Sequence, residues 1–463
     1  MSMEKNGPKI FTITLILFLV LLLDSCQPHI ATGIWKQRGY GRILKVDGSE
    51  FSIYTSTDGY CNELSSKGKF DKHFKIVSID ENELIIDHGS TRNYHFTRIN
   101  ELPSVCGSGN ENFDTNPIKN FSVFWQLFEE NYAFFEQRGI DWNEVNQYYT
   151  PKVEQIKSES EFYQLIKSIL DSLHDGHVKI RVPESTSTEA NKNDFNFEQV
   201  KVEIPDAILN KYVASPKSYN VKTISWGKLK GTNVGYIVVP KMFGFPNYGL
   251  SEDDFNKKLN EVFDADPGPG YDYFQEERRG VDFVMEKIHA DLGDTDSIVF
   301  DLRFNEGGFS SVSLKLLSHF IHKPYKAYTR TIEKNTEEPL VQDYIIKPAM
   351  KNIFNQKICL LTSYWSASAS EIFALSSMPS DNFTRYGSKT NGVLSEVAWC
   401  VLPNGWEISM SVEVVSDPIG KEYEVVGVPV DFDMNYPENG MDFYQSFYQH
   451  GEFADPLLEK FLK

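Results

Sequence analysis

The chain has 463 residues, of which 41% are hydrophobic, 14% aromatic and 24% charged. This balance is typical of globular proteins and excludes a collagen, a coiled coil and a wholly disordered chain; at about 100–200 residues per domain, the length predicts two to four domains. The formal net charge of −19 argues against a protein that follows the phosphate backbone of nucleic acids, so we expect no nucleic-acid partner.

The N-terminal segment has the pattern of an export signal. Lys5 and Lys9 form a basic start, and the apolar run over 10–23 is shorter than the ~20 residues that span a bilayer. We therefore predict a signal peptide over residues 1–25 rather than a permanent membrane helix.

The end of this signal resembles the lipobox of bacterial lipoproteins. It reads Leu23-Asp24-Ser25-Cys26, with Asp24 as the departure from the pattern. The resemblance implies that Cys26 becomes the lipidated N-terminus, followed by a tether over 26–34, and that the lipid holds the protein at a membrane. By resemblance to enterobacterial lipoprotein sorting, Gln27 after the cysteine implies the outer membrane within the cell envelope of a Gram-negative-type bacterium. The alternative is plain secretion, with Cys26 incidental.

Residues 35–100 contain short apolar runs of strand length separated by turn signals, which predict a small all-β domain, a barrel or a sandwich. Five cysteines are too few for a disulfide scaffold and too scattered for a zinc site, so we expect no metal. Export to an oxidising compartment permits disulfides. Cys61 and Cys106 flank this β-rich segment, and we predict that they pair.

The hydrophobic period then changes along the chain. Apolar residues at three- and four-residue steps predict a helical subdomain over 113–182. The polar stretch that follows predicts a linker or lid over 183–232. From 233 to 463, apolar strands alternate with helices, which predicts an α/β core with a mostly parallel sheet.

Unusual chemistry follows two of the core strands. Residues 301–308 read Asp-Leu-Arg-Phe-Asn-Glu-Gly-Gly, and residues 366–371 read Ser-Ala-Ser-Ala-Ser-Glu at a strand-to-helix turn. Ligand sites of open α/β sheets gather beyond the carboxyl ends of strands. Paired glycines can present backbone N–H groups there, and a serine at a helix N-terminus lies where an oxyanion is favoured. Taken singly, each segment also fits an ordinary turn or a helix cap.

Together the two segments resemble the serine peptidase family that includes C-terminal processing peptidases, the tricorn protease core and the interphotoreceptor retinoid-binding protein. Three further segments fit it: residues 173–177 (Leu-His-Asp-Gly-His), 387–392 (Gly-Ser-Lys-Thr-Asn-Gly) and 424–431 (Glu-Val-Val-Gly-Val-Pro-Val-Asp). The resemblance covers about 113–463 and implies a crotonase-like core of ββα layers. Processing peptidases also insert a PDZ domain, for which residues 183–232 leave no complete length.

The family has two catalytic arrangements. Processing peptidases use a lysine about 25 residues after the serine, where this chain has Val393; Lys389 is the nearest substitute. The tricorn branch uses a histidine before the core and a late glutamate, which match His177 and Glu424, although its serine directly before the histidine is replaced by Gly176.

The chemistry agrees with the tricorn arrangement, because a serine hydroxyl needs a base, and an imidazole base needs a carboxylate to orient it. We predict Ser368 as nucleophile, His177 as base and Glu424 as orienting group. The resemblance places the oxyanion hole at the N–H groups of Ala369 and Gly308, with Gly307 as the alternative donor. Glu371 is a secondary candidate that fits a helix-capping role equally well.

The sequence thus predicts a lipid-anchored serine endopeptidase of the cell envelope that needs no cofactor and acts on peptides or unfolded chain ends. The rival prediction is a non-catalytic binding module, since the retinoid-binding relatives keep this fold. Retention of Ser368, His177 and Glu424 together favours the enzyme.

Overall fold

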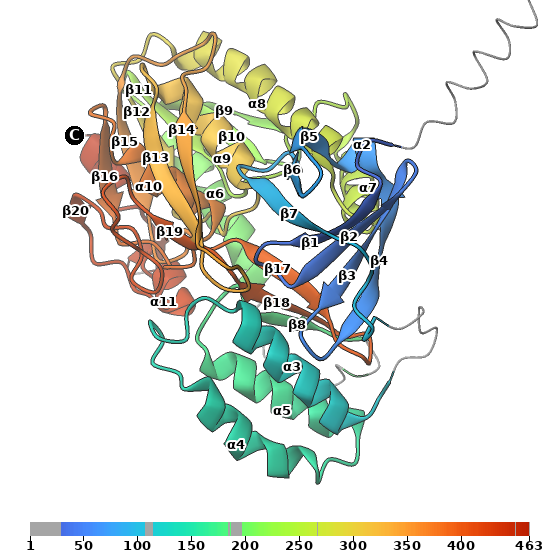
Figure 1. Cartoon of the computed structure of the whole chain (residues 1–463). Helices are drawn as coiled ribbons and strands as arrows, with labels where there is room; N and C mark the ends of the chain where they lie inside the picture. Colours follow the sequence, from blue (N-terminus) through green and yellow to red (C-terminus); the bar gives the residue numbers. More distant parts are fainter. Residues whose placement is uncertain are drawn as a thin grey trace, which may run out of the picture.

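The computed structural model describes residues 29–106, 114–183, 186, 197–265, 267–449 and 451–462. The predicted signal peptide and Cys26 lie outside these residues. Figure 1 shows a β-rich N-terminal part, a group of three helices and a larger α/β part. Over the described ranges, no helix combines the length and the apolar character needed to cross a membrane.

The N-terminal part is one antiparallel sheet. Its elements are β1 (Gly33–Gln37), β2 (Arg42–Asp47), β3 (Glu50–Ser56), β4 (Cys61–Lys69), α2 (Phe70–His73), β5 (Lys75–Ile79), β6 (Glu83–Asp87) and β7 (Asn93–Ile99). The strand order is β4-β3-β2-β1-β7-β6-β5. Since β4 and β5 lie at opposite edges and do not pair within the described residues, the sheet is open rather than a closed barrel.

Both faces of this sheet are covered, which explains the weak alternation of its strands. In β2, Leu44 packs in a cluster with Trp35 and Phe51, while Ile43 packs on the other face with Tyr54. A disulfide joins Cys61, at the start of β4, to Cys106, which lies beside it after β7. The disulfide therefore ties the end of the sheet domain back to its edge strand.

Three helices form the next part: α3 (Pro117–Asn131), α4 (Trp142–Val153) and α5 (Glu159–Ser172). Side chains of Asn116, Asp141 and Ser158 cap their N-termini. The helices share a hydrophobic core with a three-stranded sheet of order β17-β18-β8, formed by β8 (Lys179–Arg181), β17 (Val397–Val401) and β18 (Glu407–Ser411). Figure 1 shows this small sheet between the helices and the N-terminal sheet.

The α/β part is built on a seven-stranded sheet of order β20-β16-β15-β12-β11-β10-β9. Its strands are β9 (Val213–Tyr219), β10 (Ile224–Leu229), β11 (Val234–Val238), β12 (Ser297–Asp301), β15 (Lys357–Thr362), β16 (Phe383–Gly387) and β20 (Phe432–Asp433). Strands from β11 to β20 run parallel, while β9 and β10 are antiparallel additions at one edge. The mixed α/β core with a mostly parallel sheet is therefore confirmed.

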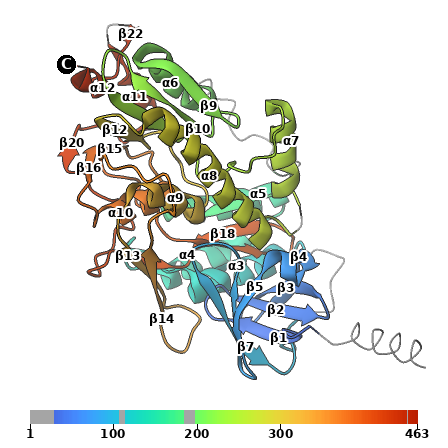
Figure 2. The same ribbon diagram turned by 90° about the horizontal axis from the view of Figure 1, so that it is seen from above.

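Helices cover both faces of this sheet because its strands are apolar on both sides. Helices α8 (Tyr271–Leu292), α9 (Ser310–Leu317) and α10 (Ala369–Ser377) pack with Ile298 and Phe300 of β12. On the other face, Val299 packs in a cluster with side chains of α6 (Phe197–Tyr212), α11 (Gly440–Gln445) and α12 (Leu458–Phe461). Figure 2 shows α6, α11 and α12 at the end of the molecule away from the N-terminal sheet.

The remaining elements are α7 (Glu252–Phe263), η2 (Ser318–Phe320), a three-stranded sheet of β14 (Leu340–Ile346), β13 (Tyr325–Ile332) and β19 (Val414–Ser416), and the short pair β21 (Tyr448–Gln449) and β22 (Glu452–Phe453).

One expected boundary is wrong. The stretch 183–232 was predicted as linker or lid, but its second half forms α6, β9 and β10, which belong to the core. The polar composition misled because β9 is an edge strand, whose residues are exposed except for Val213 and the half-buried Tyr219. Most residues between 184 and 196 lie outside the described part, so the lid itself stays a prediction.

Candidate active site

Ser368 lies at the turn between β15 and α10. Its backbone has φ 57° and ψ −120°, a left-handed conformation that non-glycine residues rarely adopt. Such strained residues cluster at functional sites, and a sharp strand-to-helix turn is how hydrolases expose a nucleophilic serine. The Ser368 side chain is only half-buried, so the turn presents its hydroxyl at the surface of the core.

The neighbouring serines are occupied by the loop after β12. The buried Ser366 donates its hydroxyl to the Leu302 carbonyl at 2.7 Å, and the buried Ser370 donates to the Asn305 carbonyl at 2.8 Å. These bonds fasten the serine turn to the end of β12. Of the three serines in the motif, Ser368 is the one that is not buried.

The paired glycines divide into two roles. Gly307 is buried and donates its N–H to the Asn305 side chain at 2.8 Å, whereas Gly308 is exposed. Within the described residues, the N–H groups of Gly308 and Ala369 donate to no protein acceptor. A Cβ on Gly307 would lie 2.6 Å from the Ser368 Cβ and 3.1 Å from the Ala369 nitrogen. The free N–H of Ala369 and the glycine pair therefore lie beside the serine.

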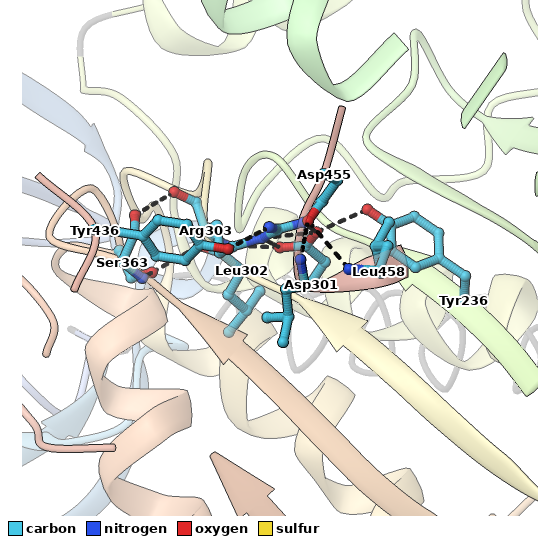
Figure 3. Close-up of polar contacts among 10 residues, drawn as sticks. Tyr236, Asp301, Leu302, Arg303, Ser363, Tyr436, Asp455 and Leu458 are labelled. Atoms are coloured by element: carbon cyan, nitrogen blue, oxygen red, sulfur yellow. Dashed lines mark hydrogen bonds and ion pairs between the residues drawn. The ribbon is translucent and has the colours of Figure 1, made fainter. Parts of the chain in front are cut away.

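A buried ion network holds the start of the same loop (Figure 3). The guanidinium of Arg303 contacts Asp301 at 2.6 Å and Asp455 at 2.7 Å, and it donates to the Tyr436 hydroxyl at 2.9 Å. Ser363 donates to the Arg303 carbonyl at 2.6 Å. The two carboxylates raise the pKa of Arg303 against the opposing effect of burial. This network explains the Asp and Arg of the motif as supports of the loop.

Glu371 is buried in the first turn of α10 and accepts four hydrogen bonds. The donors are the N–H groups of Ser368 (2.9 Å), Gly392 (2.7 Å) and Val393 (2.9 Å) and the Thr390 hydroxyl (2.7 Å). Burial raises the pKa of Glu371 to about 7, and these donors oppose the rise. Glu371 thus caps helix α10 and holds the 390–393 turn against Ser368. These contacts correspond to the helix-capping role predicted for it.

His177 lies just before β8, in the helical part's small sheet. Its N–H donates to the Asp175 carboxylate at 2.9 Å, and its carbonyl accepts from the Ser409 hydroxyl at 2.7 Å. The ring is half-buried, and its Nδ1 atom is buried without a hydrogen-bond partner in the described structure. Desolvation lowers the pKa of His177, while Asp175 and Glu396 oppose this effect.

Glu424 is buried on the other side of the 390–395 segment. Its Oε2 accepts the N–H groups of Leu394 at 2.7 Å and Ser395 at 3.1 Å, and its Oε1 lies 3.5 Å from the Arg138 guanidinium. Arg138 also lies 3.6 Å from Asp175. Burial, followed by the charges of Asp175 and Glu371, raises the pKa of Glu424 well above its ordinary value.

The three predicted triad residues share neighbours in the 390–395 segment. Gly176 faces Val393, which donates its N–H to the same Glu371 that holds Ser368. Across the described ranges, no hydrogen bond or ion pair joins His177 to Ser368 or Glu424. Among the residues that the structure describes, neither the buried Oε1 of Glu424 nor the His177 Nδ1 has a hydrogen-bond partner. Around the predicted base, one atom of His177 and one atom of Glu424 are therefore still able to form a hydrogen bond.

Lys389 points elsewhere. Its ammonium group lies 3.1 Å from the Glu438 carboxylate, and both side chains are exposed. Val393, at the position of the dyad lysine, is buried. Among the described residues, no group of three or more His, Cys, Asp or Glu side chains is arranged to hold a metal ion.

Sequence reasoning missed three charged residues of this region. Asp175 stands inside a motif segment, so its spacing to His177 was a usable signal. The sequence held no signal for Arg138 or Glu396, because the residues that they contact lie far away along the chain. The side chains of Asp175 and Arg138 are buried, whereas that of Glu396 is 26% exposed.

Comparisons with known proteins agree with this architecture. Residues 233–434 match the model of peptidase family S41, and residues 114–171 match the model of the tricorn protease C1 domain. A solved protein from Parabacteroides merdae, assigned as a peptidase, is 20% identical with a TM-score of 0.53 over 70% of this chain and 91% of its own.

Two further solved structures are more distant. Mature CPAF is 11% identical with a TM-score of 0.48 over 71% of this chain and 94% of its own. The photosystem II D1 C-terminal processing protease is 13% identical with a TM-score of 0.40 over 73% and 99%. With the S41 model matched on the core and the C1 model on the helical part, the chain carries a core of the S41 peptidase type and is a serine-type peptidase.

Proposed function

We propose that the chain cleaves peptides or unfolded protein ends through an acyl-enzyme on Ser368, with His177 as base and Glu424 as orienting carboxylate. The observation that carries the proposal is the strained turn that exposes Ser368 beside the free N–H groups of Gly308 and Ala369. Charge that develops on a carbonyl oxygen in the transition state needs such preorganised donors.

The steps follow from these groups. The Ser368 Oγ attacks the peptide carbonyl while His177 takes the hydroxyl proton, and the N–H groups of Gly308 and Ala369 stabilise the oxyanion. His177 then gives the proton to the leaving amine. A water molecule, activated by His177, hydrolyses the ester and restores Ser368.

The choice of base is supported by the surroundings of the two candidates. A neutral imidazole is the competent form, and burial keeps His177 neutral by lowering its pKa. Lys389 is exposed, and its ammonium group pairs with the Glu438 carboxylate. Tricorn-type sites have a serine directly before the base, and this chain has Gly176 there. In the proposed site Glu424 therefore orients His177 without help from a neighbouring serine hydroxyl.

A binding module without catalysis is the second candidate, and one observation favours it: His177 makes no bond to Ser368 or Glu424 within the described structure. Catalytic hydrogen bonds are often loose in ligand-free enzymes. The distinction between the two candidates therefore belongs to experiment.

Labelling with a fluorophosphonate tests the proposal directly. The wild-type protein should form an adduct that mass spectrometry places on Ser368, Ser368→Ala should not react, and Ser380→Ala should react as the wild type does. A folded wild-type protein that stays unlabelled across pH 5–9 would favour the binding module.

We further propose that the protein is exported and held at the outer membrane of the cell envelope through a lipid on Cys26. The support is the short apolar run and the Leu-Asp-Ser-Cys ending. Mass spectrometry of the purified protein should find an acylated Cys26 at the N-terminus. An unmodified N-terminus at another residue would contradict the anchor.

A further inference from the structure

The N-terminal sheet rests against the small sheet that carries His177. Arg42 of β2 donates to the Trp399 carbonyl at 2.8 Å, and Thr55 of β3 accepts from the Val401 N–H at 3.3 Å. Trp399 and Val401 belong to β17, which pairs with β18. Strand β18 in turn pairs with β8, which begins two residues after His177. Three strands thus connect the N-terminal sheet to the base.

A buried group of charges crosses the same interface. Arg92, directly before β7, lies 3.0 Å from the Glu396 carboxylate and 3.3 Å from Glu413. Arg330 of β13 lies 3.1 Å and 2.9 Å from the same two carboxylates. The Arg92 side chain is 6% exposed and that of Glu413 is 1% exposed. Two cations and two anions therefore balance one another in an interface where Arg92, Arg330 and Glu413 are buried and Glu396 is 26% exposed. The Tyr40 hydroxyl also donates to Glu413.

Glu396 belongs to the segment that holds the orienting carboxylate. The two residues before it, Leu394 and Ser395, donate their N–H groups to Glu424. The Ser395 hydroxyl donates to the Glu396 carbonyl at 3.0 Å and accepts the Glu413 N–H at 3.0 Å. Any shift of Glu396 therefore moves the two N–H donors on which Glu424 depends.

We propose that Arg92 is a positioning residue of the peptidase site: through Glu396, the N-terminal sheet fixes the 394–396 segment and the charge balance around His177. The inference rests on the roles proposed for His177 and Glu424. It gives the N-terminal sheet a part in catalysis, because the sheet supplies one of the two cations that compensate Glu396.

The charges around His177 set the direction of the expected effect. Burial lowers the pKa of His177, the negative charges of Asp175 and Glu396 raise it, and the positive charges of Lys179 and Arg138 lower it. Without the Arg92 charge, Glu396 is compensated by Arg330 alone, so the imidazolium is favoured and the pKa of His177 rises. Glu396→Gln has the opposite sign, because it removes an anion and leaves both arginines.

The experiment measures the rate of fluorophosphonate labelling of Ser368 against pH. Arg92→Gln should move the acid limb of the profile upward by about half a pH unit and lower the plateau rate about tenfold. In Arg92→Lys the acid limb should stay at the wild-type pH, and the plateau rate should lie between those of Arg92→Gln and the wild type. Lysine restores the positive charge but cannot contact both Glu396 and Glu413 as the guanidinium does. Glu396→Gln should move the limb downward.

The matched control is Arg98→Gln. Arg98 belongs to β7 of the same sheet and lies over the Trp35 ring, 4.0 Å from its centre. This variant should change thermal stability without moving the limb or the plateau.

The inference is overturned if Arg92→Gln loses only thermal stability and keeps the wild-type limb and plateau, since Arg92 would then be interface packing alone. If Arg92→Gln does not fold, Glu396→Gln decides, and an unmoved limb in that variant overturns the inference. Failure of the proposed triad is read separately: the wild-type protein would not label at Ser368, or His177→Ala would label at the wild-type rate.

Discussion

The nucleophile and the base of this site belong to regions that are built differently. Ser368 stands in a turn fastened by hydrogen bonds to the backbone of the loop after β12 and by Glu371. His177 and Glu424 stand among charges, with Arg138 shared between Glu424 and Asp175 and with buried polar atoms left unpartnered.

The difference has a physical consequence. Hydrogen bonds from the Ser366 and Ser370 hydroxyls to backbone carbonyls change little with pH, so they should hold the serine turn wherever the protein is folded. Glu371, whose pKa is raised to about 7 by burial, adds a support that does depend on pH. Charge pairs depend on the protonation of each partner. We therefore expect substitutions near the nucleophile to lower the rate mainly by displacing Ser368. Substitutions near the base should act mainly by changing the local charge and the pH dependence of the rate.

The largest effect is expected from the two reacting side chains. His177→Ala should lower the rate of peptide hydrolysis by about four orders of magnitude, as much as Ser368→Ala, because nucleophile and base act as a unit. The double variant should be no slower than either single one. Steady-state kinetics at pH 8 checks this, and a mild loss in His177→Ala would transfer the base role to another group.

A test of shape on the nucleophile side is Gly307→Ala. The added methyl group would lie 2.6 Å from the Ser368 Cβ and 2.8 Å from the Ala367 carbonyl, and φ of Gly307 is +105°. A displaced serine should cost about a hundredfold in rate.

The matched control is Gly268→Ala, where the nearest atom is 3.9 Å away. It should change the rate less than twofold. Equal rates in the two variants would show that the turn tolerates movement.

The pH profile tests the charged side. Burial lowers the pKa of His177, so the neutral imidazole should persist to more acidic pH than the ordinary ~6.5. The acid limb of kcat/KM should therefore lie below pH 6.5 and fall about tenfold per pH unit below it. A limb near pH 8 or above would point to an amine as the base.

Glu424→Gln should separate activity from stability. Activity should fall, but less than in His177→Ala, because the imidazole can still act in a minority tautomer. The folded-state pKa of Glu424 is raised above its unfolded value, so the wild-type protein loses stability as pH rises past the ordinary glutamate pKa.

Glutamine has no proton to lose, so the unfolding free energy of Glu424→Gln should fall less between pH 5 and 8. Urea unfolding at several pH values measures both slopes. Parallel slopes in the two proteins would mean that the Glu424 carboxylate is stabilised as an anion in the fold.

The same contrast explains what the sequence could predict. Apolar runs and glycine pairs are local signals, so the strands β12 and β15, helix α10 and the serine turn were all placed in advance. The assignment of Gly308 as oxyanion-hole donor, with Gly307 as the alternative, came from the family resemblance and not from a local signal, because the choice depends on which N–H the Asn305 side chain accepts.

The charged side was harder to predict because its partners are remote. Arg92 and Glu396 are about 300 residues apart, and no local pattern links them. The open N-terminal sheet and the membership of β9 in the core were missed for a related reason: whether an edge strand finds a partner is decided by the whole fold.

The smallest effect is expected at Lys389, the alternative base. Its side chain is 48% exposed and pairs with the exposed Glu438, so the pair should add little stability. Lys389→Ala should change kcat/KM less than twofold, because in the described structure the Lys389 amine pairs with Glu438 and makes no contact with Ser368. Lys351→Ala, which breaks a comparable exposed pair with Glu286, is the matched control. A large loss confined to Lys389→Ala, with its acid limb moved, would make the lysine the base and leave His177 a structural residue of the small sheet.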